Sequence, residues 1–346
     1  MIYLDSKTLH RIMETTLVER GVNTSSVQHV AESLIQTSLR GIDSHGIKLF
    51  PHYCRAIDGG RISKHPKIAI EDTGVSTAVV DADHSFGHHS GAVAMDHAIS
   101  LSKQTGIGAV SVKNSTHFGA AAYFSFRAAN ADCIGLAFTN ANALLKTFGS
   151  NEAFFGTNPI CFAAPMMSEG PFCLDMATSL ASWNRIMNKQ KENAAIPDNW
   201  AFGENGEKVT NPHEARTLNP VGEYKGYGLA MMVDILCGIL ANSLSSKDIC
   251  DMYNAPISEK RYISHFFMAI DIRKFLSTEA FKRKLQDIVI RLRNLPPSDS
   301  EGQVMVPGDP EKKFFQIRIK EGIPLDDEKF QEFLNLSEEF SDAKVM

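Results

Sequence analysis

The chain has 346 residues, of which 43% are hydrophobic and 22% charged, and these fractions exclude disorder over most of its length. A chain of this length is expected to form two domains, or one domain with large excursions. The net charge of −5, with no separate block of lysines and arginines, argues against nucleic acid or an anionic membrane surface as a partner and favours small molecules.

Targeting signals and membrane spans are not apparent in the sequence. The amphipathic N-terminus lacks the apolar run of a signal peptide, and no later stretch reaches the ~20 apolar residues of a membrane helix. The six cysteines are scattered singly, without a CxxC pair, which favours reduced and mostly buried thiols. We therefore expect a cytoplasmic protein.

The first part of the chain has the periodicity and caps of helices. Helices are predicted over residues 5–21 and 24–41, because each begins at a capping residue and ends at a glycine. A third helix is predicted over residues 45–60, and Asp43 or Ser44 lies where it would be capped.

From residue 67 the pattern changes to mixed strands and helices. Strands are predicted at 68–70, 77–81, 107–112, 134–139, 161–164 and 265–271, and helices at 90–105, 119–129, 229–240, 278–295 and 326–340. Residues 172–178 are predicted to lead from a strand into a helix. The strand, helix, strand order implies a sheet with at least one parallel crossover. Polar residues follow both 107–112 and 134–139, so they would face one crevice beyond the strand ends.

His45 is the first candidate for chemistry, because it stands beside an acid and a hydroxyl in the segment 40–48. A neutral imidazole titrates near pH ~6.5, and a neighbouring carboxylate or hydroxyl can fix its tautomer. The same residues also agree with a helix cap followed by a surface histidine. His117, beyond the strand at 107–112, is a second acid/base or substrate donor, or else a core or dimer-contact histidine.

Nucleotide and metal signatures are weak. No GxGxxG follows a strand and no GxxxxGK[ST] occurs, so a standard Rossmann or P-loop site is not expected. Lys225, flanked by glycines before a helix, is a phosphate candidate or a solvated lysine in a turn. Asp175 either accepts a ribose hydroxyl or caps the following helix. Residues 81–89 contain ligand types for a metal, but their spacing is more typical of a hydrophilic loop, and we expect no metal.

Several short motifs, each weak alone, occur together in order and spacing. They are residues 43–46 (DSHG), 155–159 (FGTNP), 174–178 (LDMAT), 196–197 (IP) with Trp200, 225–228 (KGYG) and 307–309 (PGD). In this combination they resemble the malate/L-lactate dehydrogenase family over nearly the whole chain.

The resemblance implies an NAD(P)-dependent oxidoreductase that works as a homodimer without metal. Its cofactor, NAD or NADP, would exchange a hydride with a small 2-hydroxy or 2-keto acid, malate-, lactate- or ureidoglycolate-like, while a histidine handles the proton. The implied fold is an α/β mixed sheet forming a non-Rossmann dinucleotide-binding domain, residues 67–277. A helical substrate and dimer domain would be formed by both chain ends, residues 1–66 and 278–346.

Site residues are carried over by position. His45 and His117 would be catalytic, with Ser44 orienting His45, and Tyr53 and Lys48 would contact the substrate. The residues implied to contact the cofactor are Asn140, Ala141, Asn142, Asp175, Met176, Ala177, Lys225, Pro307, Gly308 and Asp309.

Two departures from the family pattern bear on the substrate. Members that act on small carboxylic acids often have an arginine at the position of Leu49, where it binds carboxylate bidentately. Lys146 is an added cation in a segment that also differs from the family. The alternatives are reduction of a cyclic imino acid (piperideine- or pyrroline-2-carboxylate) and a nucleotide-binding homologue without catalysis.

Overall fold

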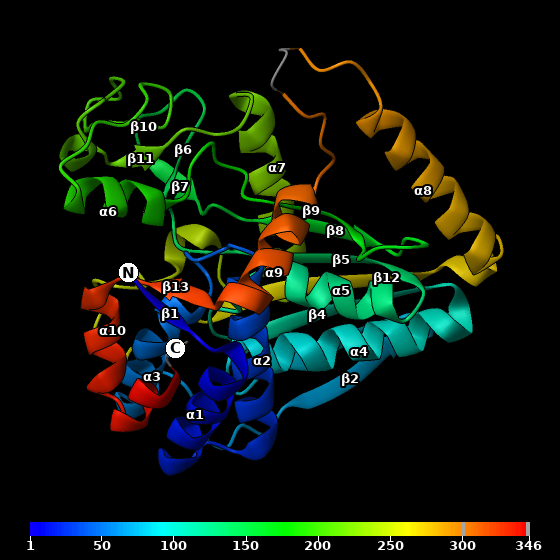
Figure 1. The fold of residues 1–346 in the computed structure, drawn as a ribbon, viewed down its shortest axis with the longest axis horizontal. Helices are drawn as coiled ribbons and strands as arrows, with labels where there is room; N and C mark the ends of the chain where they lie inside the picture. The colour runs from blue at the N-terminus through cyan, green and yellow to red at the C-terminus, as the bar shows by residue number, and fades with distance from the viewer. Residues whose placement is uncertain (299–301, 344–346) are drawn as a thin grey trace.

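The computed structural model describes residues 1–298 and 302–343, and a seven-stranded sheet runs through its centre (Figure 1). Its strand order is β2-β3-β4-β12-β5-β8-β9. The strands are β2 (Ala69–Gly74), β3 (Thr77–Asp81), β4 (Ile107–Ser115), β5 (Cys133–Thr139), β8 (Ile160–Ala164), β9 (Phe172–Met176) and β12 (Ile263–Asp271). The mixed α/β fold expected from the sequence is therefore confirmed.

Strand β12 sits between β4 and β5 and runs antiparallel to both. The predicted parallel crossover is present, because β3 and β4 pair in parallel and are joined by α4 (Gly87–Thr105). β4 and β5 point the same way but are separated by β12. The residues after their carboxyl ends therefore meet the residues before the amino end of β12 at one edge of the sheet, and the functional site lies there.

Helices cover both faces of the sheet because its central strands are apolar on both sides. α4 and α5 (Ala122–Asn130) pack on one face, where Phe267 and Ala269 of β12 are buried. On the opposite face, Phe266 packs with the π-helical turn η3 (Ile235–Ile239), which continues α7 (Tyr224–Asp234). Alternate residues of one strand thus supply two separate cores.

Both ends of the described chain contribute to one helical cluster (Figure 1). Strand β1 (Ile2–Leu4) pairs with β13 (Ile323–Leu325), and the helices around them share a single apolar core. Those helices are α1 (Ser6–Glu19), α2 (Thr24–Leu39), η1 (Ile47–Leu49), α3 (Phe50–Asp58), α10 (Asp327–Leu334) and η6 (Glu338–Ala343). The division into two domains stays a prediction. Val289 of α8 (Thr278–Arg293) packs with Met166 and Val306 rather than in this core.

A second, small sheet flanks the site. Its strand order is β10-β11-β6-β7, and α6 (Trp183–Lys191) packs beside it. The strands are β6 (Leu145–Lys146), β7 (Ala153–Phe155), β10 (Ala201–Phe202) and β11 (Thr217–Leu218), and the remaining short turns are η2 (Pro212–Glu214), η4 (Ser246–Asp248) and η5 (Ile272–Lys274). This layer closes the side of the site opposite the helical cluster.

Two local expectations were wrong. Neither Asp43 nor Ser44 caps a helix, because η1 begins after Gly46, without a side-chain cap, and the Ile47 amide donates instead to Ser38 Oγ at 2.8 Å. α9 (Asp309–Glu321) is not predicted from the sequence, because its apolar side chains do not follow a helical period. Across residues 1–298 and 302–343, no helix is both long and apolar enough to cross a membrane.

Candidate active site

The two candidate histidines meet at the edge of the sheet. His45 lies in the turn between α2 and η1, and His117 lies just beyond β4, so they come from different layers of the fold. Their rings stack with centroids 5.7 Å apart. This arrangement favours a shared site over a surface position for His45 and over a core or dimer-contact role for His117.

Each ring is held by a hydroxyl through its Nδ1 atom. Ser44 Oγ lies 2.8 Å from His45 Nδ1, and Tyr53 Oη lies 2.7 Å from His117 Nδ1. The Nε2 atom of each ring is therefore the one left for a substrate. Asp43 does not orient His45, because its carboxylate accepts from Arg318 Nη2 at 3.0 Å.

Burial keeps both imidazoles neutral. Loss of solvation lowers the pKa of His45 to about 4, and burial, followed by the nearby His45 and Arg261 charges, lowers the pKa of His117 well below its ordinary value. Burial also raises the pKa of Tyr53 well above the usual value for a phenol, so its hydroxyl stays protonated. At neutral pH the pair is thus in the proton-accepting form.

A cleft of about 360 Å³ opens onto both histidines. Its walls combine the end of β9, the start of α6, the helical cluster and the segment before β12. Besides the histidines, its lining includes Ile42, Ser44, Leu49, Ala120, Ala141, Asn142, Asp175, Met176, Ala177, Trp183, Asn184, Asp251, Tyr253, Arg261 and Glu311. Tyr53 supports His117 from behind. Lys48 does not line the cleft, and its Nζ lies 3.4 Å from Asp326.

Asp175 joins this cleft to a second cavity of about 420 Å³, which is also lined by Pro307 and Gly308. Its Oδ2 accepts from the Ala122 amide at 2.9 Å. Asp175 therefore caps the start of α5 across the fold, and not the helix that follows it in the sequence. Burial raises the pKa of Asp175 to about 6.

The residues predicted to contact a cofactor fall into two groups. Ala141, Asn142, Asp175, Met176, Ala177, Pro307 and Gly308 line the cleft or the second cavity. Asn140, Lys225 and Asp309 line neither. Asn140 Nδ2 donates to the Leu244 carbonyl, Lys225 is exposed at the start of α7, and Asp309 pairs with Arg293. The roles of both groups stay predictions.

Three of the polar residues of segment 81–89, Asp81, Asp83 and His89, make structural contacts. Asp81 Oδ2 accepts from Asn114, Asp83 Oδ2 accepts from the Lys67 amide, and His89 Nδ1 lies 2.9 Å from Ser26 Oγ. In the described part of the chain, no group of three or more His, Cys, Asp or Glu side chains is placed to hold a metal ion.

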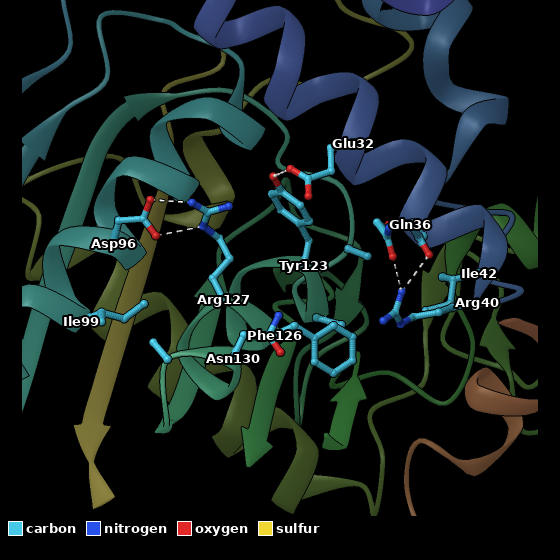
Figure 2. A pocket seen from close by; sticks show the side chains of 14 residues that line it. Glu32, Gln36, Arg40, Ile42, Asp96, Ile99, Tyr123, Phe126, Arg127 and Asn130 are labelled. Carbon is cyan, nitrogen blue, oxygen red and sulfur yellow. Dashed lines mark hydrogen bonds and ion pairs between the residues drawn. The ribbon is translucent and has the colours of Figure 1, made fainter. Parts of the chain in front are cut away.

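Another cavity, of about 610 Å³, lies between α2, α4 and α5 and is lined by neither histidine (Figure 2). Figure 2 shows that its charged side chains already have partners: Arg127 binds Asp96, and Tyr123 donates to Glu32 at 2.8 Å. Its size therefore does not make it the better candidate for chemistry.

Sequence reasoning missed Arg261, which lines the cleft two residues before β12. No motif of the sequence singles out the residues directly before β12. The place of Arg261 at the site can be recognised only once β12 is known to run antiparallel between β4 and β5, because the amino end of β12 then lies beside the carboxyl ends of β4 and β5.

Comparison with known proteins gives a family match over nearly the whole chain. Residues 4–334 match the malate/L-lactate dehydrogenase family. The chain is 32% identical over 329 residues to a ureidoglycolate dehydrogenase (NAD(+)) of Escherichia coli O157:H7, covering 95% of this chain and 94% of the relative. It is 36% identical over 320 residues to a malate dehydrogenase of Pyrococcus abyssi, covering 89% and 87%.

Solved structures give the same result. The crystal structure of malate dehydrogenase from Entamoeba histolytica superposes with a TM-score of 0.92 at 30% identity and covers 98% of each chain. The match in sequence and in fold extends over nearly the whole chain, including the histidine cleft. The protein therefore belongs to the malate/L-lactate dehydrogenase family.

Proposed function

We propose that this dehydrogenase interconverts a small 2-hydroxy acid and the corresponding 2-keto acid with NAD or NADP, and that the pair of His45 and His117 moves the proton. The observation that carries the proposal is the pair of neutral imidazoles, 5.7 Å apart, in a cleft that continues past Asp175 into a second cavity.

The chemistry of the chain's residues follows from their protonation. In the oxidative direction, the Nε2 of one histidine accepts the proton of the substrate hydroxyl while the C–H bond of the same carbon breaks. That carbon becomes the carbonyl carbon of the 2-keto acid. A bound oxidised nicotinamide supplies the acceptor for the hydride. Tyr53 and Ser44 hold the rings so that Nε2 faces the substrate. In the reductive direction the same imidazolium returns the proton.

The residues present fit a dinucleotide. Two adjoining cavities, about 360 and 420 Å³, match a ligand with two nucleoside halves. Asp175 Oδ2 is bound to the Ala122 amide, which leaves Oδ1 for a ribose hydroxyl. The N-terminus of α9, preceded by Pro307 and Gly308, borders the second cavity.

A substrate panel tests the proposal. Lactate-, malate- and ureidoglycolate-like acids are oxidised with NAD and with NADP, and the matching keto acids are reduced, while the absorbance of the reduced nicotinamide is followed. We expect turnover with at least one acid and loss of turnover in His45→Gln. His213→Gln, at an exposed site remote from the cleft, is the control. Turnover of piperideine- or pyrroline-2-carboxylate alone, with no hydroxy or keto acid accepted, would contradict the proposal.

We also propose that two copies of the chain associate. α8 extends away from the body of the protein, as Figure 1 shows, and carries exposed apolar side chains at Ile288, Ile290 and Leu292. α9 adds exposed Phe314 and Ile319. Light scattering of the purified protein should give twice the mass of the chain, and a monomer at micromolar concentration would contradict this.

A further inference from the structure

Arg261 is a buried cation without a directly paired carboxylate, and the acidic charge of Asp251 acts on it only from beyond ion-pair distance. Its side chain is only 3% exposed, yet no carboxylate oxygen of the described residues lies within 4.0 Å of its guanidinium. Burial lowers the pKa of Arg261 to about 10, so it stays charged at neutral pH. A buried charge is normally paired, because an unpaired one loses its hydration without compensation.

The guanidinium is held in place by neutral acceptors. Nε donates to the Cys250 carbonyl at 3.1 Å, and Nη2 donates to Asn142 Oδ1 at 2.8 Å. Nη1 donates to no atom in the described part of the chain. Because Arg261 lines the cleft, Nη1 and the second hydrogen of Nη2 are left to bind a ligand there. Two such donors match the two oxygens of a carboxylate.

The position of Arg261 relative to the two histidines also suits an anchor for the substrate carboxylate. Asn142, which holds Arg261, lines the same cleft, and the charge of Arg261 is one of the causes that lower the pKa of His117. In a 2-hydroxy acid the carboxylate is bonded to the reacting carbon. An anchor for the carboxylate therefore has to lie beside the acid/base residues, as Arg261 does.

No second cation is available in the cleft. Among its described lining residues, Arg261 is the one lysine or arginine. Lys48 is turned to Asp326, and Lys146 Nζ lies 3.2 Å from the Gly206 carbonyl and over the Phe202 ring. Leu49 presents an apolar side chain where a cation would serve a further acidic group. Asp251 and Glu311 make the rest of the cleft unfavourable for a second anion.

We infer that Arg261 anchors the single carboxylate of the substrate and that this dehydrogenase prefers 2-hydroxy acids with one negative charge over those with a second carboxylate or sulfonate. This inference rests on the proposed function, since it specifies the substrate class of the same cleft.

Arg261→Met and Arg261→Lys test the anchor, with Arg127→Met as the matched control at a paired arginine outside the cleft. We expect Arg261→Met to raise KM for lactate about 10- to 100-fold, the effect of losing one hydrogen bond to a charged group. Arg261→Lys should recover part of the loss. The Kd for the reduced nicotinamide and the kinetics of Arg127→Met should stay unchanged.

Lactamide separates anchoring from a merely structural role. Wild type should prefer lactate to lactamide, and Arg261→Met should lose that preference, because only the carboxylate needs the charge.

Removing the guanidinium should also move the acid limb of the kcat/KM profile to higher pH. In a comparison of two acids, Leu49→Arg should raise the malate-to-lactate ratio of kcat/KM. Unchanged preference in Arg261→Met would overturn the inference, and so would a wild type that uses malate better than lactate.

The controls keep the two proposals separate. If Arg261→Met does not fold, a wild type that fails to prefer lactate over lactamide still overturns the anchor. If no hydroxy or keto acid is turned over at all, the proposed function fails. Binding of pyruvate to protein loaded with reduced nicotinamide, followed by Trp183 fluorescence in wild type and Arg261→Lys, then decides the anchor independently. Equal affinity for pyruvate and for pyruvamide in wild type would refute it.

Discussion

Tyr53→Phe removes one oxygen atom from behind the catalytic pair. The Tyr53 hydroxyl, buried and protonated, lies 2.7 Å from His117 Nδ1, and Tyr53 is 1% exposed. This contact engages Nδ1, fixes the orientation of the ring and leaves Nε2 for the substrate. In the variant, His117 Nδ1 has no partner, and water has little access to replace it.

The magnitude follows from the burial of this contact. Leaving a buried polar atom unsatisfied costs about 1 to 3 kcal/mol. If the same cost appears in the transition state, kcat falls about 5- to 150-fold, since each 1.36 kcal/mol is a factor of ten. The unfolding free energy should fall by a similar amount, about 1 to 3 kcal/mol.

Steady-state kinetics and urea unfolding of the same preparation measure both effects. Tyr123→Phe is the control, because the Tyr123 hydroxyl is also buried but donates to Glu32 at 2.8 Å, away from the cleft. It should lose stability without losing kcat. If Tyr53→Phe keeps the kcat of wild type while Tyr123→Phe loses stability as expected, the hydroxyl does not position His117 and the reasoning fails.

Four further predictions concern acid stability, the histidine turn and the wall of the cleft. Burial holds the pKa of His45, His52 and His89 at about 4, so between pH ~6.5 and ~4 these histidines take up protons in the unfolded chain but not in the folded protein. The free energy of unfolding should therefore fall as the pH is lowered from ~6.5 to ~4. A urea midpoint that stays constant over this window would contradict the pKa directions. Arg318→Met should lower the unfolding free energy by about 1 to 3 kcal/mol, measured in urea, because it leaves the Asp43 carboxylate without its guanidinium. Ser44→Ala should lower kcat by about 5- to 10-fold through loss of one hydrogen bond to His45, and an unchanged kcat would show that Ser44 does not orient the ring. Gly119→Ala should cost about 1 to 2 kcal/mol in thermal unfolding, because φ is +75° and a Cβ would lie 2.7 Å from His88 Nε2; full stability would show that this turn can relax.

The regular elements could be predicted where their local pattern is strong. Residues 6–19 and 278–293 carry caps and helical spacing, and β5 and β12 are apolar runs between turn residues, so local preferences and tertiary packing agree. α9 could not be found in this way. Its exposed Phe314, Ile317 and Ile319 follow no core-facing period, and a helix of that kind is shaped by contacts beyond its own sequence.

The candidate site was predictable only in part for a related reason. His45, His117 and Ser44 stand out because reactive residue types follow one another in a short segment or after a strand. Arg261 does not, because its importance depends on the insertion of β12 between β4 and β5, which joins residues more than a hundred positions apart. The cap that Asp175 provides to α5 is likewise a contact across the fold and has no local signature.

The most direct test of the central claim is single-turnover transfer of hydride from the best hydroxy acid, followed by stopped flow in His45→Gln and in His117→Gln. If the pair takes the substrate proton in a nicotinamide cleft, at least one variant should bind the oxidised cofactor with the affinity of wild type and reduce it at least about 100-fold more slowly. Transfer at the wild-type rate in both variants would contradict the account.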